Sequence, residues 1–234
     1  MEGMKISIQS NIIMIEENIE KALKKSGREG EKVELIAVTK TIDIDRINET
    51  IRVGISNIGE NKVQELEKKY DLIGDTVNYH MIGHLQTNKV KNIIGKTRLI
   101  HSLDRLSLAK ELDKRSKNSD IITDVLVQVN VAEEESKFGL KVEEVLYFIE
   151  EILDLKNIKV RGLMTIAPNT TDEILLRKVF RTLYNLKENI INKNYENLSM
   201  DYLSMGMTND YELAIEEGSN MIRVGSAIFG KRNY

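Results

Sequence analysis

The 234-residue sequence predicts an α/β fold, a single (β/α)8 TIM barrel with an extra N-terminal helix. Two observations lead to this prediction. Short apolar runs alternate with amphipathic segments about eight times, which is typical of parallel strands covered by helices. No linker or low-complexity segment interrupts the alternation, so we expect one domain over residues 1–234. A doubly wound open sheet is the alternative, although no G-x-G-x-x-G motif opens its first unit.

The chain begins with a predicted amphipathic helix within residues 1–28. Its apolar residues recur at helical spacing and share one face: Ile8, Ile12, Ile15, Ile19, Ala22 and Leu23. We expect this helix to end near Gly27 and to pack on the barrel through that face.

The predicted strands and helices then alternate along the chain. The strands are expected at 33–38, 55–58, 77–82, 98–102, 124–131, 158–166, 202–205 and 221–224. The helices between them are expected near 44–51, 63–70, 89–94, 106–115, 142–153, 173–191 and 211–217. Each predicted strand is a short apolar run, and each helix carries apolar residues on one face. Eight such units in a chain of this length favour a closed barrel over an open sheet.

The composition excludes several classes of function. Hydrophobic residues make up 41% of the sequence and the net charge is −3, with no basic stripe that would suit nucleic acid. No run reaches the roughly 18–20 apolar residues that span a bilayer, and the first residues do not resemble a signal peptide. We therefore expect a cytoplasmic protein that binds neither nucleic acid nor membrane. The sequence has no cysteine and only three histidines, so we expect no metal site.

The segment 203–230 predicts a phosphate site. Two predicted strands end there in turns of small and hydroxyl residues: Ser204, Gly206, Thr208, Gly225 and Ser226. The first N–H groups of a helix have no partner inside the helix, so turns that precede helices attract phosphate. Arg223 adds a permanent positive charge. Ordinary helix capping is the alternative interpretation, but phosphate sites in barrels usually follow the last two strands.

Side chains capable of chemistry recur where the predicted strands end. They are Lys40, Glu60, Asn61, His84, Ser102, Asn130, Met164, Thr165, Ser204 and Arg223. In a barrel these ends form one rim, where active sites lie. Lys40 is a solvated surface residue on one interpretation. Beside a phosphate site, it could instead form a Schiff base with an aldehyde, either that of pyridoxal 5'-phosphate (PLP) or that of a sugar phosphate.

Several motifs together resemble one known family. They are Ala37-Val38-Thr39-Lys40, Gly59-Glu60-Asn61, Gln64-Glu65, His80-Met81-Ile82-Gly83-His84-Leu85-Gln86-x-Asn88-Lys89, Gln128-Val129-Asn130, Ser136-Lys137-x-Gly139, Arg161-Gly162-Leu163-Met164, Leu203-Ser204-Met205-Gly206-Met207-Thr208-x-Asp210 and Arg223-Val224-Gly225-Ser226-Ala227-Ile228-Phe229-Gly230. In order and spacing, over about residues 6–232, they resemble the pyridoxal phosphate homeostasis protein family.

The resemblance implies a PLP barrel of fold type III, like the N-terminal domain of alanine racemase. PLP would be held as a Schiff base on Lys40, and Arg223 would face the pyridine nitrogen. The phosphate would lie at Ser204, at the turn from Gly206 to Thr208, and at Gly225-Ser226. The full set of cofactor-binding residues that it implies is Lys40, Asn61, His84, Ser204, Met205, Gly206, Thr208, Arg223, Gly225 and Ser226.

The same residues favour a carrier over an enzyme. An arginine against the pyridine nitrogen keeps that nitrogen unprotonated, which makes PLP a weaker electron sink. Racemisation also needs two acid–base groups, and Lys40 supplies only one. Racemases take the second from a β-rich domain that we do not find in this sequence.

We therefore predict a non-catalytic protein of PLP homeostasis that buffers PLP or delivers it, with PLP-dependent apo-enzymes as candidate partners. A PLP-dependent amino-acid racemase is the main alternative. A Schiff-base aldolase that acts on a sugar phosphate is a more distant one.

Overall fold

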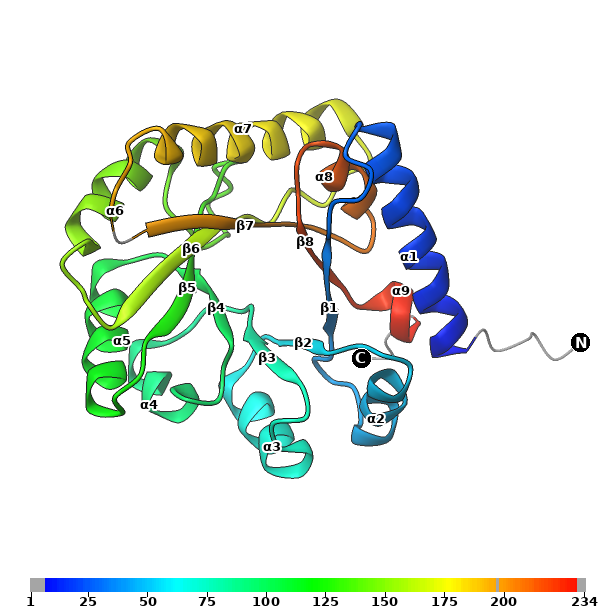
Figure 1. The fold of residues 1–234 in the computed structure, drawn as a ribbon, viewed down its shortest axis with the longest axis horizontal. Coiled ribbons are helices and arrows are strands. Elements are labelled where there is room, and N and C mark those ends of the chain that lie inside the picture. Colours follow the sequence, from blue (N-terminus) through cyan, green and yellow to red (C-terminus); the bar gives the residue numbers. More distant parts are fainter. Residues whose placement is uncertain (1–6, 197, 231–234) are drawn as a thin grey trace, which may run out of the picture.

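Eight parallel strands close into a barrel in the computed structural model, which describes residues 7–196 and 198–230 (Figure 1). The strands are β1 (Glu34–Val38), β2 (Asn57–Glu60), β3 (Asn78–Met81), β4 (Leu99–Leu103), β5 (Thr123–Gln128), β6 (Ile158–Met164), β7 (Leu198–Met207) and β8 (Met221–Val224). Each strand pairs with the next one in sequence, and β8 pairs with β1. This closure confirms the predicted TIM barrel and excludes the open sheet.

Helices cover the outside of the barrel (Figure 1). They are α1 (Ile8–Lys25), α2 (Ile44–Arg52), α3 (Val63–Ile73), α4 (Val90–Ile93), α5 (Leu106–Asn118), α6 (Val145–Ile152), α7 (Glu173–Ile191), α8 (Tyr211–Glu216) and α9 (Ser226–Phe229). The short 3-10 helices η1 (Thr87–Lys89) and η2 (Val142–Glu144) lead into α4 and α6. Every helix predicted from the sequence is present, with small differences in its ends.

The N-terminal helix α1 packs beside α8 and α9 (Figure 1). Its apolar face is buried as the spacing predicts. Asn11 Nδ2 donates to the Ile228 carbonyl at 2.8 Å, and Lys25 pairs with Glu216 at 2.8 Å. These contacts tie α1 to the last two units of the barrel. Residues 1–6 of the predicted segment 1–28, and residues 231–234, lie outside the described residues.

Alternation along the strands separates two apolar layers. On β1, Ala37 belongs to the layer between the barrel and its helices, whereas Ile36 belongs to the layer inside the barrel. The inner layer is small and consists of Ile36, Leu99, Leu126, Met164 and Met221. The polar residues His80, His101, Ser204 and Arg223 are also buried. They hydrogen-bond to one another within the barrel.

Several predicted strand boundaries differ from the structure: β5 ends at Gln128 and β6 at Met164, earlier than expected, and the ends of β2 and β7 differ as well. β2 extends through Glu60, which was expected to follow the strand. The Glu60 carboxylate bonds Lys69 of α3, outside the barrel, so it does not reach the rim. β7 begins at Leu198, four residues before the predicted start, because the polar residues of its first half gave no apolar run.

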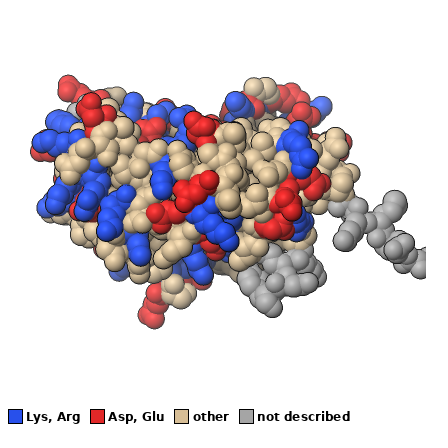
Figure 2. Space-filling view, turned by 90° about the horizontal axis from the view of Figure 1, so that it is seen from below, with Lys and Arg blue, Asp and Glu red and all other residues tan. Residues whose placement is uncertain are grey.

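Both signs of charge lie on the surface of the molecule. The face in Figure 2 carries Lys and Arg side chains interspersed with Asp and Glu. This face offers no continuous positive stripe of the kind that follows a nucleic-acid backbone. Within 7–196 and 198–230, no helix combines the length and apolar character needed to cross a bilayer.

Candidate functional site

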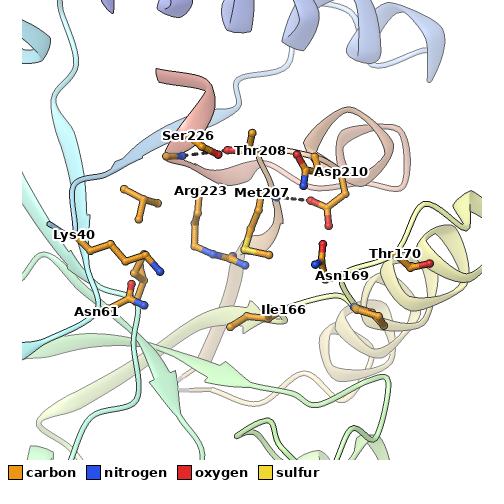
Figure 3. Close-up of a pocket in the computed structure, with 15 residues that line it drawn as sticks. Lys40, Asn61, Ile166, Asn169, Thr170, Met207, Thr208, Asp210, Arg223 and Ser226 are labelled. Atoms are coloured by element: carbon orange, nitrogen blue, oxygen red, sulfur yellow. Dashed lines mark hydrogen bonds between the residues drawn. The ribbon is translucent and has the colours of Figure 1, made fainter. Parts of the chain in front are cut away.

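A cavity of about 260 Å³ opens at the carboxyl ends of the strands, where TIM barrels hold their active sites. It is lined by Val38, Lys40, Asn61, Ile82, Ile166, Pro168, Asn169, Thr170, Met207, Thr208, Asn209, Asp210, Arg223, Gly225 and Ser226 (Figure 3). These residues end, or follow, strands β1, β2, β3, β6, β7 and β8. The first and last strands of the barrel therefore contribute to one site.

Lys40 reaches the cavity because of its place after β1. Ile36, inside the barrel, and Val38 and Lys40, in the cavity lining, are two residues apart and so face the same way. Figure 3 shows the Lys40 side chain extending into the cavity. In the described part of the chain, its Nζ atom has no hydrogen-bond or ion-pair partner, so this amine is available to a ligand.

Buried charged groups hold the backbone just before Lys40. Lys69 Nζ donates to the Thr39 carbonyl at 2.7 Å and to Glu60 Oε1 at 2.6 Å. The Thr39 hydroxyl donates to the same carboxylate oxygen. Burial raises the pKa of Glu60, and the neighbouring Lys69 opposes that rise. The carbonyl and the hydroxyl of Thr39 are thus both held by hydrogen bonds. This fixes the position of the backbone from which the Lys40 side chain extends.

The backbone just after Lys40 is also constrained. Thr41 has a φ of 62°, in the left-handed region that residues with a side chain rarely adopt. Its N–H donates to Glu65 Oε2 at 2.8 Å. The turn that presents Lys40 is therefore held by hydrogen bonds on both sides.

Arg223 provides a buried cation at the cavity. It is 4% exposed; NH1 donates to Ser204 Oγ at 2.6 Å and NH2 to the Thr165 carbonyl at 2.8 Å. Burial lowers its pKa to about 10, and Asp210 acts in the opposite direction, so Arg223 remains charged at neutral pH. No carboxylate among the described residues forms a salt bridge with it.

The loops after β7 and β8 meet at the cavity. The Gly225 N–H donates to Thr208 Oγ1 at 3.3 Å, and the Met207 N–H donates to Asp210 Oδ1 (Figure 3). Within the described chain, the N–H groups of Thr208 and Ser226 have no acceptor. Unpaired backbone N–H groups beside a hydroxyl form a site that suits a phosphate group.

The structure brings together most of the residues predicted for the cofactor. Those that line the cavity are Lys40, Asn61, Thr208, Arg223, Gly225 and Ser226. Gly206 lies just before the cavity in β7, at a φ of 95°. A side chain there would meet Ala214 Cβ at 2.7 Å and Tyr211 Cα at 2.9 Å, so glycine permits the close approach of α8.

Besides Gly206, three more predicted residues lie outside the cavity lining. Ser204 is fully buried and touches Arg223 from below, which places it away from the turn where phosphate was expected. Met205 faces the apolar layer between the barrel and its helices. His84 stacks on Phe138 with ring centroids 3.7 Å apart and lines a neighbouring hollow that shares Asn61 with the cavity.

The cavity also contains residues that are not in the predicted cofactor set. Asp210 is the only carboxylate that the described residues contribute to the lining, and burial raises its pKa. Pro168, Asn169 and Thr170 come from the loop after β6. The one proline of the sequence marked that loop, but a proline by itself carries no sign of a ligand.

The fold and the cavity define a TIM-barrel protein with an available lysine and a buried arginine at one site. Comparison with known proteins identifies the family. The family model described as alanine racemase, N-terminal domain, matches residues 11–233. The chain belongs to the pyridoxal phosphate homeostasis protein family, as its motifs had suggested.

Individual relatives align with this chain along nearly their whole length. A pyridoxal phosphate homeostasis protein of Aquifex aeolicus is 43% identical over 219 residues, 93% of this chain and 95% of the relative. One of Haemophilus influenzae is 38% identical over 233 residues, 98% of each chain. The structure of PipY from Synechococcus elongatus with PLP bound has a TM-score of 0.79 and 28% identity, covering 91% of this chain and 100% of that one.

Proposed function

We propose that this protein binds PLP in the cavity through a Schiff base on Lys40, and that it buffers or delivers PLP in the cytoplasm without catalytic turnover. The observation that carries the proposal is the convergence of Lys40, Arg223 and the β7 and β8 loops on one cavity. The names of the relatives, and the PLP bound to PipY, support the same ligand.

The residues of the cavity fit the functional groups of PLP. PLP supplies an aldehyde that condenses with a primary amine and releases water, and Lys40 provides the available amine. Thr208 and the unpaired N–H groups of the two loops suit the phosphate. Arg223, which can only donate hydrogen bonds, suits the unprotonated pyridine nitrogen.

The lining supports binding more than turnover. Arg223 remains charged, so a ring nitrogen that accepts its hydrogen bond stays unprotonated and PLP is a weak electron sink. Among the described residues, the lining contains no tyrosine, histidine or cysteine to oppose Lys40 as a second acid–base group. Its one carboxylate, Asp210, already accepts the Met207 N–H.

The first experiment tests the lysine. Purified wild-type protein and the variants Lys40→Ala and Lys62→Ala are incubated with PLP, scanned for Schiff-base absorbance, reduced with borohydride and mapped by mass spectrometry. Lys62 is exposed and close in sequence, so Lys62→Ala is the matched control. We expect a PLP adduct on Lys40 in the wild type and in Lys62→Ala, and none in Lys40→Ala. An adduct on another lysine, or no uptake by the wild type, would refute the proposal.

A second experiment separates a carrier from a racemase. The loaded protein is incubated with L-amino acids, and the D-enantiomer is measured over many equivalents. We expect no multiple-turnover conversion, together with transfer of PLP to an added PLP-dependent apo-enzyme. Sustained formation of D-amino acid would instead establish the racemase.

A further inference from the structure

Below the cavity, side chains from five strands form a continuous hydrogen-bonded chain inside the barrel. Its links are Arg223 NH1 to Ser204 Oγ at 2.6 Å, Ser204 Oγ to His101 Nδ1 at 3.0 Å, His101 Nε2 to His80 Nδ1 at 3.0 Å, and His80 Nε2 to Asn57 Oδ1 at 3.2 Å. The chain leads from the cavity to Asn57, the first residue of β2, at the opposite end of the barrel. The proposed binding of PLP leaves both histidines without a role.

Only one arrangement of protons satisfies every link and also gives the proton of the Ser204 hydroxyl an acceptor. A guanidinium group can only donate, so Ser204 Oγ accepts from Arg223. The single proton of that hydroxyl is then free to go to His101 Nδ1, which must be an acceptor. If His101 carried its proton on Nδ1 instead, the Ser204 proton would have no acceptor among the described residues.

The same logic fixes the inner half of the chain. With Nδ1 as an acceptor, a neutral His101 carries its proton on Nε2 and donates it to His80 Nδ1. His80 then carries its own proton on Nε2 and donates it to Asn57 Oδ1. Asn78 Nδ2 also donates to Asn57 Oδ1, at 3.0 Å, so the chain ends on an acceptor.

Both imidazoles are held neutral by their surroundings. Burial lowers the pKa of His80 to about 3, and the charge of Arg98 acts in the same direction. Burial lowers the pKa of His101 well below its usual value, helped by His80 and by the positive charge of Arg223. The groups that accept hydrogen bonds from Arg223, Ser204 Oγ and the Thr165 carbonyl, are therefore neutral, and no carboxylate among the described residues takes their place.

We propose that His101 is a positioning residue for Arg223. By accepting the only proton of Ser204, it makes Ser204 Oγ a fixed acceptor that holds the guanidinium group at the cavity. His80 and Asn57 act one step further back, because they hold His101 in the Nε2-protonated form. Two of the five guanidinium N–H donors are engaged, by Ser204 and the Thr165 carbonyl, and the others have no acceptor among the described residues.

This inference rests on the proposed function in one respect, the identity of the ligand that Arg223 meets. For PLP, a guanidinium held by neutral acceptors keeps its full charge and donates to the ring nitrogen, whereas a carboxylate at the position of Ser204 would offset that charge. These hydrogen-bonded side chains thus help to keep the ring nitrogen of bound PLP unprotonated, although His101, His80 and Asn57 do not touch the ring.

The first test examines the proton positions without PLP. Protein labelled with ¹⁵N-histidine is studied by long-range ¹H–¹⁵N NMR near neutral pH, with His80→Asn and His101→Asn used for assignment. We expect His101 and His80 both to be neutral and protonated on Nε2. A charged His101, or one protonated on Nδ1, would overturn the proposal whether or not the protein binds PLP.

The second test measures the effect on the ligand. His101→Leu removes the acceptor for the Ser204 proton, whereas the amide oxygen of His101→Asn can replace it. Ser102→Ala is the control, since Ser102 is equally buried on the same strand and its hydroxyl has no partner in the described region. The readouts are the dissociation constant for PLP and the pH profile of the absorbance of bound PLP.

We expect His101→Leu to bind PLP about ten- to a hundredfold more weakly and to shift the pH profile. The Ser204 hydroxyl loses the acceptor for its proton, and this disturbs its own hydrogen bond to the charged Arg223. His101→Asn should recover most of the affinity for PLP and most of the wild-type pH profile. Ser102→Ala should match the wild type in both readouts. A folded His101→Leu variant with wild-type affinity and profile would overturn the proposal. If that variant does not fold, the tautomers of the wild type decide. Failure of the wild type to take up PLP would refute the proposed function while leaving the proton arrangement testable.

Discussion

Thr208 and Ser204 show how a single side chain decides what the cavity can hold. Ser204 lies within β7, and Thr208 directly follows that strand. The Thr208 hydroxyl lies in the cavity lining and accepts the Gly225 N–H, which joins the two loops. Ser204 is buried below Arg223, and its Oγ accepts a hydrogen bond from the guanidinium group. The two hydroxyls should therefore affect different parts of a ligand.

Thr208→Val should weaken the binding of PLP about tenfold and the binding of pyridoxal, which has no phosphate, much less. The reason is that the variant loses the hydroxyl beside the proposed phosphate site, and one hydrogen bond to a charged group is worth about 1.5–3 kcal/mol. Absorbance titrations with the two ligands measure the difference, and Thr208→Ser should restore PLP binding. An equal loss for both ligands would place the phosphate elsewhere.

Lys69→Met should lower the free energy of unfolding by about 3–5 kcal/mol, because it leaves the Glu60 carboxylate buried without its cation. Urea unfolding measures this change. Lys68→Met, at the exposed neighbouring residue, should alter stability little. The double variant Lys69→Met/Glu60→Gln should recover part of the loss, since no buried charge remains. Equal stability of the two single variants would contradict this account.

At the scale of elements, the close packing of β7 against α8 shapes one wall of the cavity. Gly206 stands where the two elements approach, and the loop that follows carries Thr208 and Asp210. Its positive φ and the short distance to α8 act together. Any side chain at this position would push the loop or the helix away.

Gly206→Ala should lower the free energy of unfolding by about 2–4 kcal/mol, from a strained backbone plus overpacking against Ala214. Gly74→Ala is the matched comparison, since Gly74 has a φ of 72° but nothing within 4 Å of an added Cβ. That variant should lose only about 1–2 kcal/mol. Chemical unfolding of both variants tests the difference, and equal losses would show that the contact with α8 has no effect.

The sequence predicted the elements better than it predicted the directions of side chains. Lys40 was expected at the rim because it follows the first predicted strand, and it lines the cavity. The role of Ser204 was harder to predict, because a hydroxyl before a turn can bind a phosphate or accept a hydrogen bond from a buried guanidinium group. The pairing of β7 with β8 shifts register between Ser204 and Met207, so a strict count of alternate residues does not apply there. The contact of His80 with His101 joins different strands and leaves no local pattern.

At the scale of the whole molecule, a barrel interior that contains neutral histidines makes stability depend on pH. His80 titrates near pH 6.5 in an unfolded chain and at about 3 in the folded one. The unfolded chain therefore binds a proton that the folded chain excludes. The stabilisation is complete above about pH 6.5 and is lost progressively as the pH falls toward 3.

The free energy of unfolding should fall by about 1.5 kcal/mol between pH 6.5 and about pH 5 because of His80 alone, and His101 acts in the same direction. Urea unfolding at several pH values in this range measures the slope, and His80→Asn should reduce it. A stability that stays flat from about pH 7.5 to 5 would mean that the two imidazoles are accessible to protons in the folded state.

The closure of the barrel has a consequence for how the protein is made. β1 pairs with β8 so that Ile36 lies opposite Arg223, and Lys40 follows β1 by two residues. The two sides of the cavity therefore come from the first and last strands to leave the ribosome, and they meet only after the strands between them exist. A ligand that needs both sides stabilises the completed barrel over any unfinished one. A nascent or truncated copy without β8 would have Lys40 but not the complete cavity. It would therefore not retain the ligand, which would stay in solution.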